Sequence, residues 1–258
     1  MRKIVLGAIA ALTLGFGSAH ASDAPKPPVQ KWAFDGLIGT YDRPALKRGF
    51  QIYKEVCANC HSLRLIAFRN LQAIGLTEDQ VKEVAAGYQV VAGPDDEGNF
   101  IVNGELRKRP GVAADRFPPP FANDNAARSA NGGALPPDLS LIVRSRPGGA
   151  NYIHALLTGY KEEAPEGVTL GSGMSYNQYF PGHQIAMAPP LMEGVISYED
   201  GTPTTLDQYA KDITTFLAWT SSPEMEDRKR LGIKTLLFLI VLTGMMYALK
   251  RKIWADLH

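Results

Sequence analysis

The run CANCH, residues 57–61, constrains the fold of this chain more than any other feature. Cys57 and Cys60 are the only two cysteines among the 258 residues, and His61 follows the second one directly. This spacing is typical of covalent haem attachment. Two thiols so placed can reach the two vinyl groups of one porphyrin, while the adjacent imidazole can bind the iron. The motif therefore predicts a chain that folds around a haem.

Two other chemistries use a CxxC pair, namely thiol–disulfide exchange and the binding of a metal such as zinc. A thioredoxin-like protein would show strands alternating with helices, which the sequence does not indicate. A zinc site would need further cysteines or histidines nearby. A periplasmic thiol oxidoreductase that uses Cys57 and Cys60 remains the rival from another functional class.

The haem iron of an electron carrier usually has a second axial ligand, which is Met or His. Met187 lies in the run QIAMAPPL, where Pro189 and Pro190 stiffen the backbone beyond the sulfur. Judged from the residues alone, the second ligand stays open among Met174, Met187, Met192, His154 and His183.

The first 21 residues have the pattern of a secretory signal peptide. Arg2 and Lys3 precede an apolar run, and small residues lead to Ala21. Cleavage after Ala21 would make Ser22 the first residue of the mature chain. We therefore expect residues 1–21 to be removed and residues 22–227 to form an exported, periplasmic haem domain.

A second apolar stretch lies near the carboxyl end, between basic clusters at 228–230 and 250–252. A helix from Leu231 to Leu249 would rise about 28 Å, enough to cross a bilayer if Lys234 extends its amine to the headgroups. We expect residues 228–252 to form a transmembrane helix with basic flanks. Residues 253–258 would then be a cytoplasmic tail.

Charge is distributed unevenly along the chain. Residues 22–227 contain 18 basic and 25 acidic residues. Such a domain would attract a cationic partner. The acidic stretches at 95–97 and 162–166 could steer that partner, or they could serve solubility alone.

Periodicity and capping signals predict a mainly α fold. Asp42 and Pro44 begin a helix whose apolar face would extend to Cys57. Capping boxes at Thr77 and Thr205 begin two more helices, the first ending near 86 and the second near 220. A further helix is expected at about 150–158. We expect residues 87–150 to be mainly loops and turns packed over a site, and no multi-stranded sheet.

Five blocks of sequence together resemble the cytochrome c1 family, the haem subunit of the quinol–cytochrome c oxidoreductase (bc1) complex, in its bacterial type. The blocks are CANCHS, NGGALPPDLSLIVRSRPGG, YNQYFPGHQIAMAPPL, EDGTPTTLDQYAKDITTFLAW and DRKRLG. The likeness extends from about residue 32 to residue 252. It implies a cytochrome c-like haem domain with long loop insertions and one carboxyl-terminal transmembrane helix.

The resemblance also implies which residues hold the cofactor, one covalently attached haem c. Cys57 and Cys60 match the family's thioether positions, and His61 and Met187 match its two iron ligands. Arg146 matches an arginine that pairs with a haem propionate. Three further positions match residues beside the haem, and they are Asn131, Pro137 and Tyr152. Some bacterial relatives carry a second cysteine pair that forms a disulfide, which this chain lacks.

The function implied is electron transfer without bond chemistry, as one subunit of an oxidoreductase. The chain would accept one electron from a Rieske iron–sulfur protein and pass it to a soluble cytochrome c. Cytochrome b, the Rieske subunit and membrane lipid would be its partners in a dimeric complex, with no role for nucleic acid. The chain would sit in a bacterial inner membrane, with its carboxyl terminus in the cytoplasm. The rival within electron transfer is a membrane-anchored c-type cytochrome of another respiratory complex.

Overall fold

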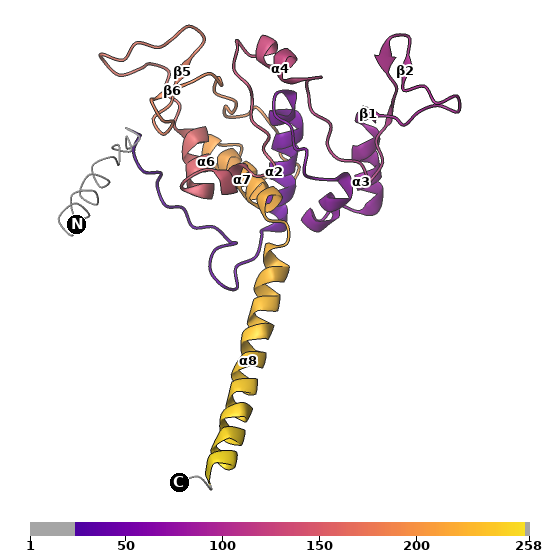
Figure 1. Cartoon of the computed structure of the whole chain (residues 1–258). Helices are drawn as coiled ribbons and strands as arrows, with labels where there is room; N and C mark the ends of the chain where they lie inside the picture. Colours follow the sequence, from indigo (N-terminus) through magenta and orange to yellow (C-terminus); the bar gives the residue numbers. More distant parts are fainter. Residues whose placement is uncertain (1–23, 256–258) are drawn as a thin grey trace, which may run out of the picture.

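A computed structural model describes residues 24–255 of the chain. The expected signal peptide, 1–21, and the last three residues of the expected tail lie outside the described residues. Figure 1 shows a head built from short helices and long loops, with a single long helix extending from it. The fold is mainly helical, as predicted.

Two crossing helices form the centre of the head, α2 (Arg43–Glu55) and α7 (Leu206–Ser221). They pack directly on each other. Their backbones nearly touch at Gly49, where an added Cβ would lie 2.6 Å from the Cβ of Phe216 and overlap the carbonyl oxygen of Asp212. Only glycine allows the two helices to approach this closely at that point.

Aromatic rings fill the space beside this crossing. Phe50 and Tyr53 of α2 contact Phe216 of α7 and Phe117, and the rings of Phe117 and Phe68 lie 4.4 Å apart. All five side chains are buried. Cys57 and Ala58 pack against this same core. The CANCH turn therefore rests on the hydrophobic core of the head.

The other helices surround the crossing pair. Helix α6 (Gly149–Thr158) packs on α7. Four shorter helical segments precede α6 in the chain: η2 (Phe68–Ile74), α3 (Glu78–Ala86), α4 (Asp124–Ala130) and α5 (Ile142–Ser145). Three antiparallel pairs of very short strands lie at the periphery. They are β1 (Gln89–Val91) with β4 (Lys108–Pro110), β2 (Ile101–Val102) with β3 (Glu105–Leu106), and β5 (Ser175–Tyr176) with β6 (Gln184–Ile185).

Capping signals predicted the helix starts well. The Asp42 side chain accepts a hydrogen bond from the Ala45 amide, and the Thr77–Gln80 capping box is present. At α7, Thr205 accepts from the Gln208 amide, but the predicted box is incomplete because the Gln208 side chain binds Asp212 instead. The predicted cap by the Thr205 side chain is therefore present, but the carboxylate of Asp212 takes the Gln208 side chain that would complete the capping box.

One sequence-based expectation needs correction. The first helix does not extend to Cys57, because α2 ends at Glu55 and Cys57 begins a separate 3-10 turn. Residues 87–150 are mainly loops and turns, as expected, and the short helices α4 and α5 and the strand pairs β1–β4 and β2–β3 lie among them. These strands are short, and their amphipathic pattern is too brief to be read from sequence.

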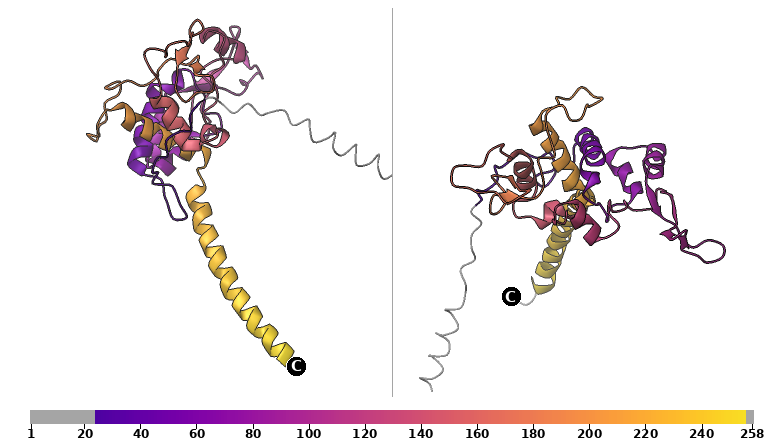
Figure 2. Two further views of the ribbon diagram at one scale, coloured as in Figure 1. Left: turned by 90° about the vertical axis from the view of Figure 1, so that its left-hand side faces the viewer. Right: turned by 90° about the horizontal axis from the view of Figure 1, so that it is seen from above.

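The long helix α8 spans Met225–Trp254 and is long and apolar enough to cross a membrane. It begins three residues before the expected start at 228. None of its apolar window is buried inside the head. Both views in Figure 2 show it leaving the head as a separate rod.

Candidate functional site

The CANCH motif forms one tight turn after α2. The 3-10 helix η1 (Cys57–Asn59) follows Val56, and the Cys57 carbonyl accepts hydrogen bonds from the amides of Cys60, at 3.1 Å, and His61, at 2.9 Å. This turn brings both thiol-bearing residues and the imidazole into one short loop. Such compactness is what attachment of a single flat cofactor requires.

His61 is oriented by a carbonyl group. Its Nδ1 lies 2.8 Å from the carbonyl oxygen of Pro137. Because a carbonyl can only accept, Nδ1 carries the hydrogen and Nε2 keeps a free lone pair, the arrangement found in metal-binding histidines. Burial lowers the pKa of His61, which keeps the imidazole neutral. The residue thus fits the role of proximal iron ligand.

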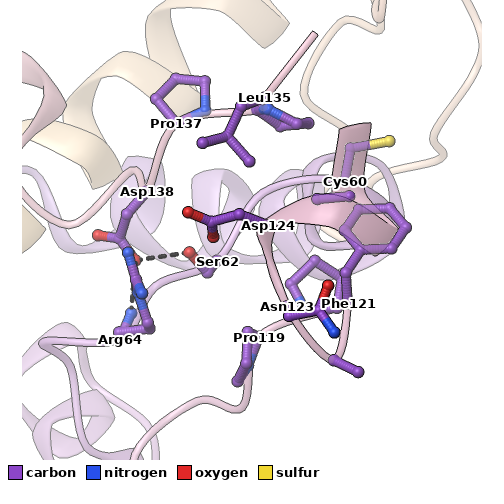
Figure 3. A pocket seen from close by; sticks show the side chains of 14 residues that line it. Cys60, Ser62, Arg64, Pro119, Phe121, Asn123, Asp124, Leu135, Pro137 and Asp138 are labelled. Atoms are coloured by element: carbon purple, nitrogen blue, oxygen red, sulfur yellow. Dashed lines mark hydrogen bonds and ion pairs between the residues drawn. The ribbon is translucent and has the colours of Figure 1, made fainter. Parts of the chain in front are cut away.

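Asp138, which the sequence analysis did not single out, fixes the position of that carbonyl. Its carboxylate accepts hydrogen bonds from Ser62 Oγ at 2.7 Å and from the amides of Arg64 and Ser140, each at 2.9 Å. Figure 3 shows Asp138, Ser62 and Arg64 of this cluster at one end of a pocket. Burial raises the pKa of Asp138, but these hydrogen bonds together hold it below its usual value. Asp138 therefore joins the segment after His61 to the segment that contains Pro137.

The first thiol is poorly suited to redox exchange. Burial, and to a smaller extent the neighbouring Cys60, raise the pKa of Cys57 to about 12. A nucleophilic cysteine needs the opposite shift, because only the thiolate attacks a disulfide. Cys57 is partly buried against the core, and its raised pKa disfavours the thiolate that redox exchange needs. Among residues 24–255, no group of three or more His, Cys, Asp or Glu side chains could hold a metal ion.

Met187 belongs to a second group of side chains. It follows β6, and its carbonyl oxygen accepts a hydrogen bond from the Tyr160 hydroxyl at 3.1 Å. Burial raises the pKa of Tyr160, with a further contribution from Tyr152. Burial also raises the pKa of Tyr152, while the charge of Arg146 lowers it. Tyr160, which the sequence did not single out, is therefore the residue that contacts the Met187 backbone, and the charges of Tyr152 and Arg146 influence this group only through the pKa values of the tyrosines.

The alternative ligands differ in their surroundings. Met187 is half-buried, whereas Met174 and Met192 are 38% and 65% exposed. His154 is buried and its Nε2 lies 3.0 Å from Asp207, so its ring is engaged elsewhere. His183 stacks on Tyr176, and its Nδ1 has no hydrogen-bond partner. A weak thioether ligand needs shielding from water, which favours Met187.

Asn131 lies at the carboxyl end of α4, where its side-chain amide donates to the Ala127 carbonyl at 2.7 Å. Ala127 lines a pocket of about 230 Å³ together with Cys60 and Pro137. Figure 3 shows that the sulfur of Cys60 points away from the Asp138 side of this pocket. The structure thus joins Cys60, His61 and Pro137 at one place and places α4 beside them. No hydrogen bond among residues 24–255 links this group to Met187 or Arg146.

Comparison with known proteins identifies close relatives over almost the whole chain. The family model described as the Cytochrome C1 family matches residues 32–257. The protein named Cytochrome b/c1 from Bradyrhizobium diazoefficiens is 48% identical over 278 residues, which cover 99% of this chain and 40% of that protein. Cytochrome c1 from Rhodospirillum rubrum is 46% identical over 275 residues, 99% of each chain. The mitochondrial cytochrome c1 heme protein from Neurospora crassa is 46% identical over 249 residues, 96% of this chain and 71% of the relative.

Proposed function

This chain belongs to the cytochrome c1 family, and from that membership we propose that it is the electron-transferring haem subunit of a bc1 complex. It accepts one electron from a Rieske iron–sulfur protein and passes it to a soluble cytochrome c. The subunit makes and breaks no substrate bond. Its contribution to quinol–cytochrome c reductase is to hold one redox centre in place.

The observation that carries this proposal is the orientation of His61. Its hydrogen bond to the Pro137 carbonyl leaves Nε2 free, on the same turn as two cysteines at haem-attachment spacing. A thiol oxidoreductase would have no use for an imidazole held in this tautomer. A lowered thiol pKa, which that rival needs, is also contrary to the burial of Cys57.

The residues present fit a covalently attached haem c. Cys57 and Cys60 would hold it through thioethers, and His61 and Met187 would be the two iron ligands. When bound, haem c supplies an iron that exchanges one electron without opening a coordination position. Arg146 would pair its guanidinium with a propionate. Pro137, Asn131 and Tyr152 would help to exclude water from the ring.

The membrane arrangement follows from the two ends of the chain. Residues 1–21 direct export and are cleaved, and residues 22–227 form the periplasmic domain. Helix α8 crosses the bacterial inner membrane once, with basic residues on both sides. The tail, 253–258, remains in the cytoplasm. Cytochrome b and the Rieske protein are the membrane partners in a dimeric complex.

Co-purification tests this proposal against the rival within electron transfer. The chain, tagged at its carboxyl terminus and extracted in mild detergent, should retain a b-type cytochrome and the electron paramagnetic resonance signal of a Rieske cluster. Added quinol should then reduce the c-type haem. Isolation with a terminal oxidase and without those two partners would assign the chain to a different respiratory complex.

A further inference from the structure

The segment of residues 32–40, here called the interface loop, exposes two large apolar side chains. Leu37 and Ile38 are each 83% exposed. Isolated exposed leucines are common on proteins. Two adjacent exposed apolar side chains at the tip of a closed loop are less common, and such patches mark sites of interaction.

The interface loop is held in a defined shape. The Asp35 amide donates to the Trp32 carbonyl at 3.0 Å, and the Thr40 amide donates to the Ala33 carbonyl at 3.1 Å. The chain closes so tightly that a Cβ on Gly39 would lie 2.7 Å from the carbonyl carbon of Phe34. Leu37 and Ile38 are therefore presented to the surroundings by a closed turn and not by a frayed end.

The base of the loop is attached to the first turns of α8. Lys229 Nζ donates to the carbonyls of Phe34, at 2.6 Å, and Gly39, at 3.0 Å. Glu226 accepts from the Tyr41 amide at 2.7 Å and pairs with Arg43 at 2.6 Å. The views in Figures 1 and 2 agree that the loop lies beside the start of the long helix.

This attachment sets the height of the loop tip. Lys229 lies two residues before Leu231, where the apolar stretch of α8 begins. In Figure 1 the loop points along α8, away from the rest of the head. If α8 spans the membrane, as proposed above, Leu37 and Ile38 lie at the level where the helix enters the bilayer.

We propose that the interface loop inserts Leu37 and Ile38 into the lipid headgroup region, as a second membrane contact beside α8. Apolar side chains next to basic ones are the composition of interfacial anchors. Arg228 and Arg230 lie exposed near the start of α8, where each also pairs with a carboxylate, Glu224 or Asp227. The area that two side chains can bury is far smaller than the roughly 800 Å² per partner that a stable protein interface buries. Continuity with the apolar surface of α8 favours lipid over a partner protein.

The contact would restrain the head. A domain held by one helix can tilt and rotate about that helix. A loop fixed to the helix by Lys229 and Glu226, with its tip in the headgroup layer, restricts tilting toward or away from the membrane. The redox centre is thereby kept at a constant height above the bilayer.

Spin labels on three variants test the proposal. Ile38→Cys reports on the loop, Ile101→Cys is a matched control on the β2 hairpin, where the native side chain is 59% exposed, and Leu239→Cys reports on the middle of α8. The haem-loaded full-length chain is reconstituted into vesicles of phosphatidylcholine and phosphatidylglycerol. Power saturation with oxygen, which concentrates in lipid, and with a water-soluble nickel complex measures the environment of each label.

The label at 38 should be several-fold more accessible to oxygen, relative to nickel, than the label at 101, and less so than the label at 239. Equal ratios at 38 and 101 would overturn the proposal while leaving the membrane helix intact. A water-exposed label at 239 would overturn both the proposal and the span on which it rests. In the purified complex, shielding of the label at 38 from both reagents would assign the loop to a protein partner and overturn the lipid contact.

Discussion

The environment of His61 depends on a carboxylate that never touches it. Asp138 binds Ser62 and two backbone amides and so holds the Pro137 carbonyl against the imidazole. That hydrogen bond makes a ligating histidine more basic and favours the oxidised iron. The position of the carbonyl, and hence the reduction potential, should therefore respond to changes at Asp138.

Substituting Asp138→Asn should raise the reduction potential of the haem by roughly tens of millivolts, where 59 mV is a tenfold change for one electron. The amide cannot accept all the hydrogen bonds that the carboxylate accepts, so the Pro137 carbonyl is held less firmly. Redox titration of the purified protein measures the shift. Asp124→Asn, in the wall of the same pocket, is the control and should leave the potential unchanged. Equal potentials in both variants would exclude a positioning role for Asp138.

The second ligand is tested by Met187→Leu. Loss of the thioether should lower the reduction potential sharply and open the iron to small ligands such as carbon monoxide. Met192→Leu removes an exposed methionine from a nearby loop and should change neither property. An unaltered potential in Met187→Leu would transfer the role to Met174, Met192 or a histidine.

His154 should make stability depend on pH. Burial lowers its pKa below the usual 6.5, although Asp207 acts in the opposite direction. As the pH falls through that value, the unfolded chain binds a proton before the folded chain does, so the free energy of unfolding decreases. Urea unfolding of the haem-loaded protein at pH 7 and pH 5 should show this loss. His154→Gln should reduce the difference between the two values, and an undiminished difference would contradict the assignment.

Some candidate site residues can be singled out from sequence because their chemistry is tied to local spacing. Cys57, Cys60 and His61 belong to one motif, whereas Met187 stood apart from four other candidates only through the resemblance to the family. Asp138 binds Ser62 and the Arg64 amide, and Tyr160 binds the Met187 carbonyl. These partners are distant in sequence, and such contacts leave no pattern of residue types. The only available signal for Asp138 was its place directly after Pro137.

At the scale of elements, the crossing of α2 and α7 supports the turn that carries the motif. Gly49→Ala would place a methyl group against the backbone of Asp212 and the side chain of Phe216. We expect this substitution to destabilise the protein by about 1–3 kcal/mol, because a packed crossing cannot absorb extra volume. Chemical unfolding monitored by the haem absorption measures the change. Gly87→Ala, whose nearest contact would be an ordinary 3.4 Å, is the control.

The same elements explain which parts of the fold could be predicted. The starts of α2, α3 and α7 were predicted correctly, because each depends on a capping side chain a few residues away. The end of α2 was predicted wrongly, because the helix breaks at Val56 to form the turn that carries the cysteines, and helix propensity does not signal that break. Strands of two or three residues, such as β2 and β5, depend on their partners and lack any periodicity of their own.

At the scale of the molecule, two acidic stretches were expected to steer a basic partner, and the structure separates them. Residues 95–97 lie in the loop between β1 and β2, whereas residues 162–166 lie near β5, on the other side of the head (Figures 1 and 2). The second stretch follows Tyr160, which holds the Met187 carbonyl. We therefore expect residues 162–166 to be the ones that face an incoming cytochrome.

Electron transfer to a basic cytochrome c should slow as ionic strength rises, because salt screens the attraction between unlike charges. Neutralising Glu162, Glu163 and Glu166 together as glutamines should reduce this salt dependence. Neutralising Asp96 and Glu97 in the same way should leave it unchanged. Stopped-flow kinetics at several salt concentrations measures both effects, and a rate independent of salt in the native protein would exclude steering.

The most direct test of the whole account is the alkaline pyridine absorption spectrum of the denatured, reduced protein. Haem joined by two thioethers at Cys57 and Cys60 should give an α band near that of cytochrome c, blue-shifted from that of unattached haem b, and should stay with the protein through acid acetone extraction. Haem that is extracted into the solvent, or a colourless protein whose two thiols react freely after unfolding, would contradict the account.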